Sequence, residues 1–263
     1  MCTLTVAWQT FESHPVVVAA NRDERYDRPS AAPRSVPADP AGNGSDRRMV
    51  APVDEEAGGT WIGYNDAGVV AALTNQWVQL PEGERSRGLL VQDALARESA
   101  EAAARAVERE LAERRYEGFF LLLADGNACV LIGYDGGPTI THLDPGVHVV
   151  MNVGYDASYF VPEARADVAE RQARNGRRLY GELRPEPSEG ALEWRDRAAS
   201  CLGDHDYGVC IHGDGFGTRS SSLITVDAAG NGEYRFAPGP PCETDYERID
   251  AAVAEPGFES RRT

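Results

Sequence analysis

The chain alternates between short apolar runs and polar breaks, and this pattern predicts blocks of strands separated by pairs of helices. The first two runs, Thr3–Gln9 and Pro15–Ala20, flank a polar turn and predict a β-hairpin. Thr60–Tyr64 and Val69–Thr74, joined by an Asn-Asp-Ala-Gly turn, predict a second hairpin. Residues 25–50 between the hairpins are polar and lack periodicity, so we expect a long functional or mobile loop there.

Helical periodicity occurs in two later blocks. Over residues 86–115 apolar side chains repeat at helical spacing, with a break near Ser99 that divides the block into two helices. A second stretch begins at Pro162 and runs to about Leu183, because proline is favoured in the first turn of a helix. A partner helix is expected over Glu189–Leu202.

The remaining apolar runs are short and predict strands. They are Phe119–Leu123, Val130–Ile132, Ile140–His142, Val147–Met151, Val209–His212, Leu223–Val226 and Glu233–Phe236. Strands and helices therefore follow one another in separate blocks, which is typical of α+β proteins. We expect one domain over residues 1–263, folded as a four-layer αββα sandwich, with an extended C-terminal tail over residues 237–263.

Composition narrows the class of protein. The 263 residues are 42% hydrophobic, which suffices for a core, and no apolar run approaches the ~20 residues needed to cross a bilayer. The N-terminus lacks the basic and long apolar segments of a secretory signal. We therefore expect a cytoplasmic protein without a transmembrane segment.

The charge of the chain is strongly acidic. The 42 acidic residues exceed the 26 basic ones, the net charge is −16, and every basic residue is Arg. Phosphate backbones require a basic surface, so this balance argues against a nucleic-acid partner. An acidic surface is typical of proteins from a salt-rich cytosol, where salt screens self-repulsion, and predicts that KCl raises thermal stability. A base-composition bias of the genome explains the same residues equally well.

The cysteine and histidine positions do not suggest a metal site. Five Cys residues are present, namely Cys2, Cys129, Cys201, Cys210 and Cys242, and they form no Cys-x-x-Cys pair. The five His residues, His14, His142, His148, His205 and His212, also lack metal-binding spacing. We expect neither disulfides nor a metal, and we expect Cys129 and Cys210 to be packing residues.

Cys2 is the strongest candidate for a catalytic residue. Removal of Met1, which is usual before a small side chain, would leave a thiol and a free α-amine on one residue. An α-amino group titrates near pH ~7.7–8.0 and a free thiol near ~8.5, so the amine can act as the base for its own nucleophile. The position alone fits equally well a small apolar residue that opens a strand.

Polar residues at the ends of predicted strands supply partners for such a nucleophile. Asp23 can orient the amine, and Arg22 can stabilise a thiolate. Asn75 can donate to an oxyanion, and Asn152 can hydrogen-bond the amine. Arg219 follows a Gly-rich turn and can stabilise the thiolate or bind a substrate carboxylate. Each residue alone also fits an ordinary turn or surface ion pair, but the set provides what acyl transfer requires.

Four blocks behind Met1 and Cys2 resemble the NRDE family, the group of proteins similar to Transport and Golgi organisation protein 2. The blocks are Ala19–Glu24, Gly58–Gly63, Ala71–Asn75 and Gly215–Arg219. With the N-terminus they extend over most of the chain. The resemblance implies no settled activity, because members of this family are linked to membrane organisation, lipid metabolism and haem handling.

The same residues more distantly resemble the bile-salt hydrolases and penicillin V acylases, which are N-terminal-nucleophile hydrolases. This resemblance implies an αββα fold and hydrolysis of a non-peptide amide. It also implies roles for Cys2 as nucleophile, Asp23 near the amine, Asn75 and Asn152 around the oxyanion and amine, and Arg219 near the thiol. In those hydrolases the arginine lies a few residues before the aspartate, whereas here Arg22 directly precedes Asp23. Neighbours on a strand point to opposite faces, which leaves the role of Arg22 open.

Three functions are compatible with these residues. The leading one is an amidohydrolase with an N-terminal cysteine that needs no cofactor. Its apolar acyl pocket would be lined by Trp61, Tyr64, Trp77, Tyr155 and Phe216. The alternative is a non-catalytic carrier or trafficking factor that binds non-covalent haem or a lipid-like acid through Arg22 or Arg219. A third is a structural or assembly protein that has kept the fold and lost the chemistry.

Overall fold

One antiparallel sheet of eight strands contains the start of the chain near its centre. The computed structural model describes residues 2–39 and 45–250. In spatial order the strands of this sheet are β12 (Ser158–Tyr159), β11 (Gly154–Tyr155), β10 (Gly146–Met151), β1 (Thr3–Phe11), β2 (His14–Arg25), β13 (Phe216–Val226), β14 (Gly232–Ala237) and β15 (Glu247–Arg248). The first predicted hairpin is confirmed as β1 and β2, and β1 also pairs with β10.

A second antiparallel sheet of seven strands faces the first. Its strands in spatial order are β3 (Ser30–Pro37), β4 (Arg48–Asp54), β5 (Ile62–Asn65), β6 (Val70–Asn75), β7 (Phe119–Ala124), β8 (Cys129–Tyr134) and β9 (Pro138–His142). The second hairpin is confirmed as β5 and β6. The loop predicted over residues 25–50 is wrong, because β3 and the start of β4 lie within it. β3 is an edge strand, where Pro33 and Pro37 need not donate to a neighbour on both sides.

Four helices cover the outer faces of the sheets. They are α1 (Arg87–Leu95), α2 (Ala100–Glu113), α3 (Ala166–Glu182) and α4 (Ala191–Gly203), with short 3₁₀ helices η1 (Glu163–Arg165) and η2 (His205–Tyr207). The predicted break near Ser99 is confirmed. Its side chain caps α2 by accepting a hydrogen bond from the nitrogen of Ala102 at 3.1 Å.

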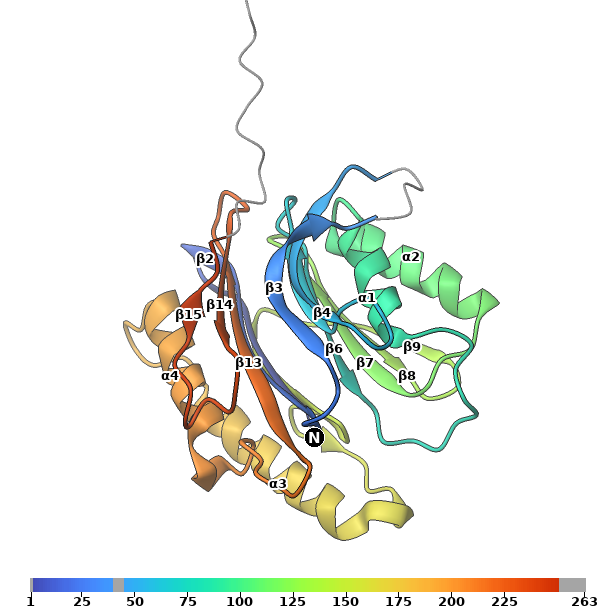
Figure 1. Ribbon diagram of the computed structural model, residues 1–263. Coiled ribbons are helices and arrows are strands. Elements are labelled where there is room, and N and C mark those ends of the chain that lie inside the picture. Colours follow the sequence, from blue (N-terminus) through green and yellow to red (C-terminus); the bar gives the residue numbers. More distant parts are fainter. Residues whose placement is uncertain (1, 40–44, 251–263) are drawn as a thin grey trace, which may run out of the picture.

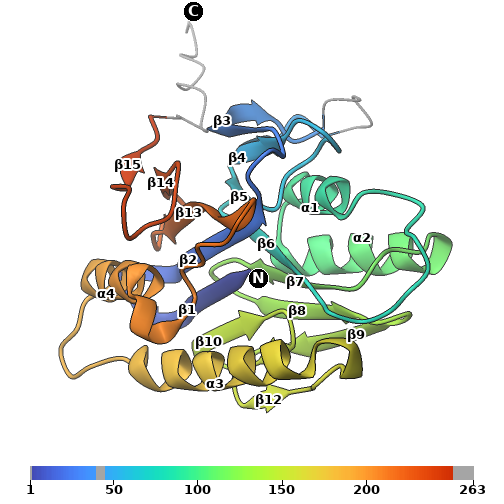
Figure 2. The same ribbon diagram turned by 60° about the horizontal axis from the view of Figure 1, so that its bottom comes forward.

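Three apolar layers hold these elements together. Leu4, Val18 and Leu122 are buried between the two sheets. A second layer joins the seven-stranded sheet to α1 and α2, and a third joins the eight-stranded sheet to α3 and α4. Figures 1 and 2 show the two helix pairs on opposite sides of the paired sheets. The predicted four-layer αββα sandwich is confirmed.

The segment over residues 209–212 is not the predicted strand. The carbonyl of Val209 accepts from Nδ2 of Asn21 at 3.0 Å, and the nitrogen of Ile211 donates to Oγ1 of Thr218 at 2.9 Å. His212 makes only an isolated bridge to Gly217. The segment is therefore an irregular strap beside β2, and its apolar character reflects packing rather than strand pairing.

The predicted C-terminal tail is described only in part. Residues 238–250 turn back toward the sheet, and β15 pairs with β14. Residues 251–263 lie outside the described residues. None of the helices in the described ranges combines the length and apolar character that crossing a bilayer requires.

Candidate active site

Cys2 lies directly before β1, at the edge where the two sheets separate. Thr3 pairs with Asn21 on one side and with Met151 on the other, which places Cys2 between the ends of β2 and β10. Figure 1 shows this end of the chain between the two sheets. A cleft of about 360 Å³ opens there, lined by residues of β1, β2, β5, β6 and the segment before α1.

The main-chain nitrogen of Cys2 is held by a buried amide. It donates to Oδ1 of Asn152 at 2.9 Å, and the same oxygen accepts from Nε2 of Gln172 at 2.9 Å. Nδ2 of Asn152 donates to the main-chain carbonyl of Asn75 at 2.6 Å. This nitrogen would be the α-amine after removal of Met1, so the structure places Asn152 against the group for which the sequence predicted it.

The thiol of Cys2 is partly buried in the same cleft. Its Sγ lies 3.8 Å from the main-chain carbonyl of Asp23. Burial raises the pKa of the thiol above its ordinary value, and the positive charge of Arg22 opposes this shift. A thiol with a raised pKa stays protonated near neutral pH, so a nucleophilic attack needs a base close by.

Arg22 and Asp23 both line the cleft but have different partners. The guanidinium carbon of Arg22 lies 4.0 Å from the ring centroid of Trp61. The carboxylate of Asp23 instead accepts from the hydroxyl of Thr218 at 2.6 Å. Burial raises the pKa of the Asp23 carboxyl group. Of these two cleft residues, Arg22 therefore packs on an aromatic ring, whereas Asp23 is bound to a hydroxyl.

Arg22 is a buried cation with spare hydrogen-bonding capacity. Its side chain is only 7% exposed, and its Nη2 lies 4.0 Å from carboxylate oxygens of both Glu24 and Asp54. Its Nη1 has no hydrogen-bond partner among the described residues. Because an unsatisfied buried donor is unfavourable, this group is suited to receive an acceptor from a ligand.

Asn75 ends β6 with an exposed side chain that lines the cleft. Its main-chain carbonyl is occupied by Asn152, whereas its side-chain amide has no hydrogen bond to another described residue. A free amide donor at the mouth of a cleft can stabilise a developing oxyanion. The side chain of Asn75 therefore lies in the cleft, and its role as an oxyanion donor stays a prediction.

Arg219 does not occupy the position predicted for it. In the described part of the chain it is not among the residues that line the cleft. Its Nη1 donates to the carbonyl of Tyr26 at 2.6 Å and its Nη2 to that of Arg28 at 3.2 Å. The register of β13 against β2 shifts between Thr218 and Ser220, so Arg219 lies at a β-bulge or similar irregularity. Its side chain therefore holds the segment after β2 through these two hydrogen bonds.

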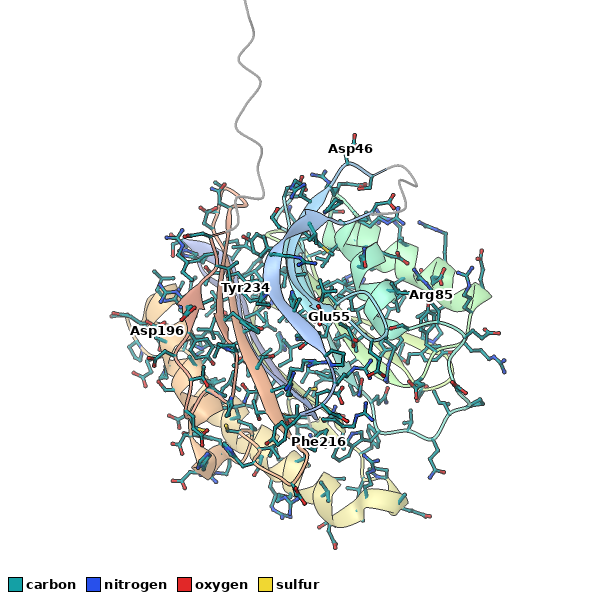
Figure 3. The ribbon with its side chains drawn as sticks, viewed as in Figure 1. Asp46, Glu55, Arg85, Asp196, Phe216 and Tyr234 are labelled. Atoms are coloured by element: carbon teal, nitrogen blue, oxygen red, sulfur yellow. The ribbon has the colours of Figure 1, made fainter. Side chains whose placement is uncertain are left out.

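The expected apolar pocket is also not formed by the five predicted aromatic residues. Trp61 alone among them lines the cleft. Tyr64 is buried and donates to the carbonyl of Gly232 at 3.0 Å, and Trp77 lies beside the Arg165 guanidinium. Tyr155 packs edge-on against another ring, and Phe216 is 38% exposed on the surface at the start of β13 (Figure 3). The cleft lining combines arginine and carboxylate side chains with small and aliphatic apolar ones instead.

Sequence analysis missed two polar residues of this region. Gln172 is the buried residue of α3 that orients Asn152. Arg87 lines the cleft at the start of α1, where it donates to the carbonyl of Gly118 at 2.9 Å and pairs with Glu117 at 3.1 Å. Burial lowers the pKa of Arg87. Neither residue belongs to a motif, and only the packing of the helices reveals them.

Glycines in the Gly58–Gly63 block bring α1 against the cleft. Gly59 has a left-handed φ of +75°, and a Cβ there would lie 2.3 Å from the carbonyl carbon of Gly88. The nitrogen of Thr60 donates to the carbonyl of Gly88 at 3.0 Å. This close contact fixes the chain directly before Trp61 and requires glycine at position 59, whereas Gly58 is favoured by its left-handed φ of +70°.

Comparison with known protein families agrees with the sequence motifs. The family model described as Transport and Golgi organisation 2 matches residues 1–236. The human Transport and Golgi organization protein 2 homolog is 29% identical over 239 residues, which are 83% of this chain and 84% of that protein. The mouse homolog is 28% identical, with 92% of each chain covered.

Comparison with solved structures identifies the fold. Penicillin V acylase from Agrobacterium tumefaciens superposes with a TM-score of 0.57 at 18% identity, covering 90% of this chain and 83% of that one. The Caenorhabditis elegans ortholog of N-acylethanolamine-hydrolyzing acid amidase gives a TM-score of 0.53 at 13% identity, covering 85% and 92%. At these identities the likeness shows a shared fold.

Proposed function

Because this chain belongs to the Transport and Golgi organisation 2 family and has the fold of the N-terminal-nucleophile hydrolases, we propose that it is a cysteine amidohydrolase. It cleaves the amide C–N bond of a small molecule after Met1 has been removed. The observation that carries this proposal is the environment of Cys2. Its nitrogen is fixed by Asn152 at 2.9 Å while its thiol lies in the same cleft.

In the first half of the proposed reaction, Sγ of Cys2 forms a bond to the carbonyl carbon of the substrate. The thiol proton moves to the α-amine of the same residue, and the carbonyl oxygen becomes an oxyanion. The side-chain amide of Asn75 donates to that oxygen, because no described residue occupies this donor. Asn152 keeps the amine oriented because its Oδ1 accepts a hydrogen bond from the amine nitrogen.

In the second half, the C–N bond breaks and the leaving amine takes the proton from the α-ammonium group. A thioester remains on Cys2. Water then attacks the thioester carbonyl, the α-amine removes a proton from that water, and the thiol is regenerated as the carboxylic acid leaves. The products are one acid and one amine, and no further reactant is required.

The cleft also restricts the substrate class. Nη1 of Arg22 is a buried donor without a partner among the described residues, and the Arg22 side chain lies over Trp61. A planar or apolar group next to an anionic group would satisfy both residues. We therefore favour small amides that carry a carboxylate or a similar anion over neutral long-chain amides.

The test combines mass spectrometry with amine release. The intact mass should show loss of Met1, and limiting iodoacetamide should label Cys2. A panel of small amides should release amine from the wild type and from Cys201→Ala, a matched change of another thiol, but not from Cys2→Ala. Retention of Met1, or amine release that is independent of Cys2, would contradict the proposal.

The carrier alternative is favoured by the unpaired Nη1 of Arg22, which could bind the carboxylate of a cargo molecule. Among the described residues that line the cleft, only Cys2 has a side chain that commonly ligates haem iron. Titration with haemin separates the two functions. A saturable spectral change that is lost in Arg22→Gln, without amide turnover in the wild type, would support the carrier.

A further inference from the structure

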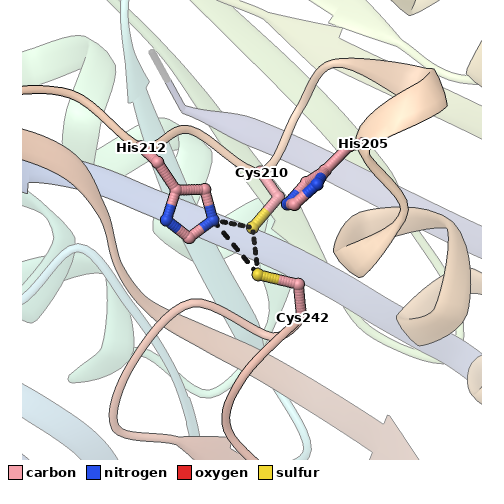
Figure 4. Close-up of side chains that lie close together, drawn as sticks. All are labelled: His205, Cys210, His212 and Cys242. Atoms are coloured by element: carbon pink, nitrogen blue, oxygen red, sulfur yellow. Dashed lines mark hydrogen bonds between the residues drawn. The ribbon is translucent and has the colours of Figure 1, made fainter.

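Two cysteines and two histidines converge on one point outside the cleft (Figure 4). The ligand atoms of His205, Cys210, His212 and Cys242, called the Cys/His cluster below, all lie within 4.8 Å of one another. The two sulfur atoms are 3.5 Å apart, and Nε2 of His212 lies 3.6 Å from Cys210 Sγ and 3.1 Å from Cys242 Sγ. Both cysteines are free thiols.

The separations among Cys210, His212 and Cys242 match the geometry of a tetrahedral metal site, and His205 lies close enough to be the fourth ligand after a small adjustment. Zinc binds cysteine sulfur at about 2.3 Å and histidine nitrogen at about 2.0 Å, so neighbouring ligand atoms of one tetrahedron lie about 3.3–3.8 Å apart. The sulfur–sulfur and sulfur–nitrogen separations fall within or just below this range. Two thiolates and two imidazoles are also a ligand set that structural zinc sites use.

The fold brings the four residues together from two loops. His205 begins η2 directly after α4, and Cys210 and His212 follow in the irregular strap. Gly208 permits the reversal between them with a left-handed φ of +63°, and a Cβ there would lie 2.5 Å from Nδ2 of Asn175. Cys242 comes from the loop between β14 and β15.

That second loop is fixed where it approaches the strap. The nitrogens of Glu243 and Thr244 both donate to the carbonyl of Pro240 at 3.0 Å, which forms a tight turn around Cys242. A Cβ on Gly203, the last residue of α4, would lie 3.1 Å from the carbonyl of Pro241. The turn therefore packs directly against the end of α4, beside the start of η2.

A carboxylate lies behind one histidine of the cluster. Nδ1 of His212 faces away from the sulfur atoms and lies 4.0 Å from Oε1 of Glu243. Histidines that bind a metal usually present their other ring nitrogen to a carboxylate or carbonyl, which orients the ring and raises its basicity. His212 therefore presents Nε2 to the two thiols and leaves Nδ1 on the side of the Glu243 carboxylate, which would need to approach by about 1 Å to accept a hydrogen bond.

We propose that the Cys/His cluster binds one Zn²⁺ ion in a structural site that is separate from the cleft. All four ligands come from the protein and leave no coordination position for a substrate, so the ion would act by joining the strap to the β14–β15 loop. Binding would displace the thiol protons of Cys210 and Cys242 to solvent. The proposal does not depend on the amidohydrolase function.

Such an ion would also stiffen one wall of the cleft. Ile211 lies between two of the ligands, and its nitrogen donates to the hydroxyl of Thr218 at 2.9 Å. That hydroxyl donates in turn to the carboxylate of Asp23 at 2.6 Å. The strap is therefore connected to the strand that carries Arg22 and Asp23 by two consecutive hydrogen bonds.

The test uses the full chain, reduced and stripped of metal with a chelator. Titration with Co²⁺ should saturate at one equivalent, with visible ligand-field bands and thiolate-to-cobalt charge transfer, and Zn²⁺ should then displace the Co²⁺. Cys242→Ser and His205→Gln should weaken Co²⁺ binding more than 100-fold, and Glu243→Gln by about 10-fold. Cys2→Ala and Cys201→Ala are the matched controls and should bind as the wild type does.

Three results would overturn the proposal. One is Co²⁺ binding without thiolate charge transfer, and another is binding that is unchanged in Cys242→Ser. The third is a disulfide between Cys210 and Cys242 in the protein as purified, together with no metal uptake after reduction. Cys242 is exposed, so its replacement should leave the fold intact, and circular dichroism of the variant checks this.

Discussion

The cleft at Cys2 and the Cys/His cluster both contain thiols, but the two regions restrain them differently. At Cys2 the main chain beside the thiol is fixed by a buried amide, and the cation of Arg22 nearby has a donor, Nη1, without a partner among the described residues. In the Cys/His cluster the thiols of Cys210 and Cys242 face each other at 3.5 Å, with imidazole nitrogen as their neighbour. One thiol surrounded by amides and a cation is suited to attack a carbonyl, whereas two converging thiols are suited to hold an ion.

The largest effect that separates the two regions is expected from Cys2→Ala. Loss of the nucleophile should lower amide turnover by about 10⁴-fold or more, because the remaining groups only bind and polarise the substrate. The zinc content and thermal midpoint of this variant should equal those of the wild type. If its turnover is retained, or its metal is lost, the two regions do not have the separate roles described here.

A smaller effect is expected from Asn75→Ala. Removal of one oxyanion donor should lower kcat by about 10²–10³-fold with little change in KM. The side chain is exposed, so the free energy of unfolding should be unchanged. A change confined to KM would instead assign Asn75 to binding the substrate in its ground state.

Thr218→Val tests the link between the two regions. The change removes the hydroxyl that joins Ile211 to Asp23, and should lower the free energy of unfolding by about 1–3 kcal/mol because a buried donor and acceptor lose their partner. Thr218→Ser keeps the hydroxyl and is the control. Chemical denaturation of both variants, with and without Zn²⁺, measures the effect. Equal stability of the two variants would show that the strap and the cleft are independent.

The smallest expected effect is a pH dependence at His148, on the strand that leads to Asn152. Burial lowers the pKa of His148, but hydrogen bonds with the Asp156 carboxylate and the Asp144 carbonyl outweigh it, and the pKa is raised. The stabilisation is complete below the unfolded pKa of ~6.5 and is lost as the pH rises through the higher folded pKa.

The measurement compares wild type and Asp156→Asn by denaturant unfolding at several pH values. The stability difference between them should be largest in acid and should shrink above the folded pKa of His148. Asp156 has a left-handed φ of 52°, which Asn tolerates, so the backbone should be unaffected. A difference that is constant with pH would exclude His148 as its source.

The hydrophobic pattern was sufficient to predict most of the fold. The hairpin of Thr3–Gln9 with Pro15–Ala20 was found because both strands are buried, and Ser99 was found because a cap interrupts the helical period. β3 was missed because an edge strand is half exposed and tolerates proline. The strap over residues 209–212 was predicted as a strand because a buried segment without strand pairing has the same apolar residues as a buried strand.

The cleft could be predicted because its residues lie at the ends of strands. Cys2 and Asn152 meet there because β1 and β10 are neighbouring strands of one sheet, and Asn75 reaches Asn152 from the end of β6 in the facing sheet. Arg219 was misplaced because a local shift in pairing cannot be detected from residue types. The Cys/His cluster was not anticipated, because Cys242 is 32 residues beyond Cys210 and reaches it only through the path of a loop.

The carboxamide of Asn152 has a wider consequence for how this protein can change. Its two polar atoms are shared among the start of the chain, the end of β6 and helix α3. A change in the packing of α3 would move Gln172, and Gln172 would in turn reorient the Asn152 amide and the Cys2 nitrogen bound to it. This would follow even from substitutions on the outer face of α3, far from any ligand. Substitutions on α3 should therefore change the reactivity of Cys2 as well as the stability of the protein. A set of variants confined to α3 would affect the nucleophile without replacing any residue that contacts the substrate.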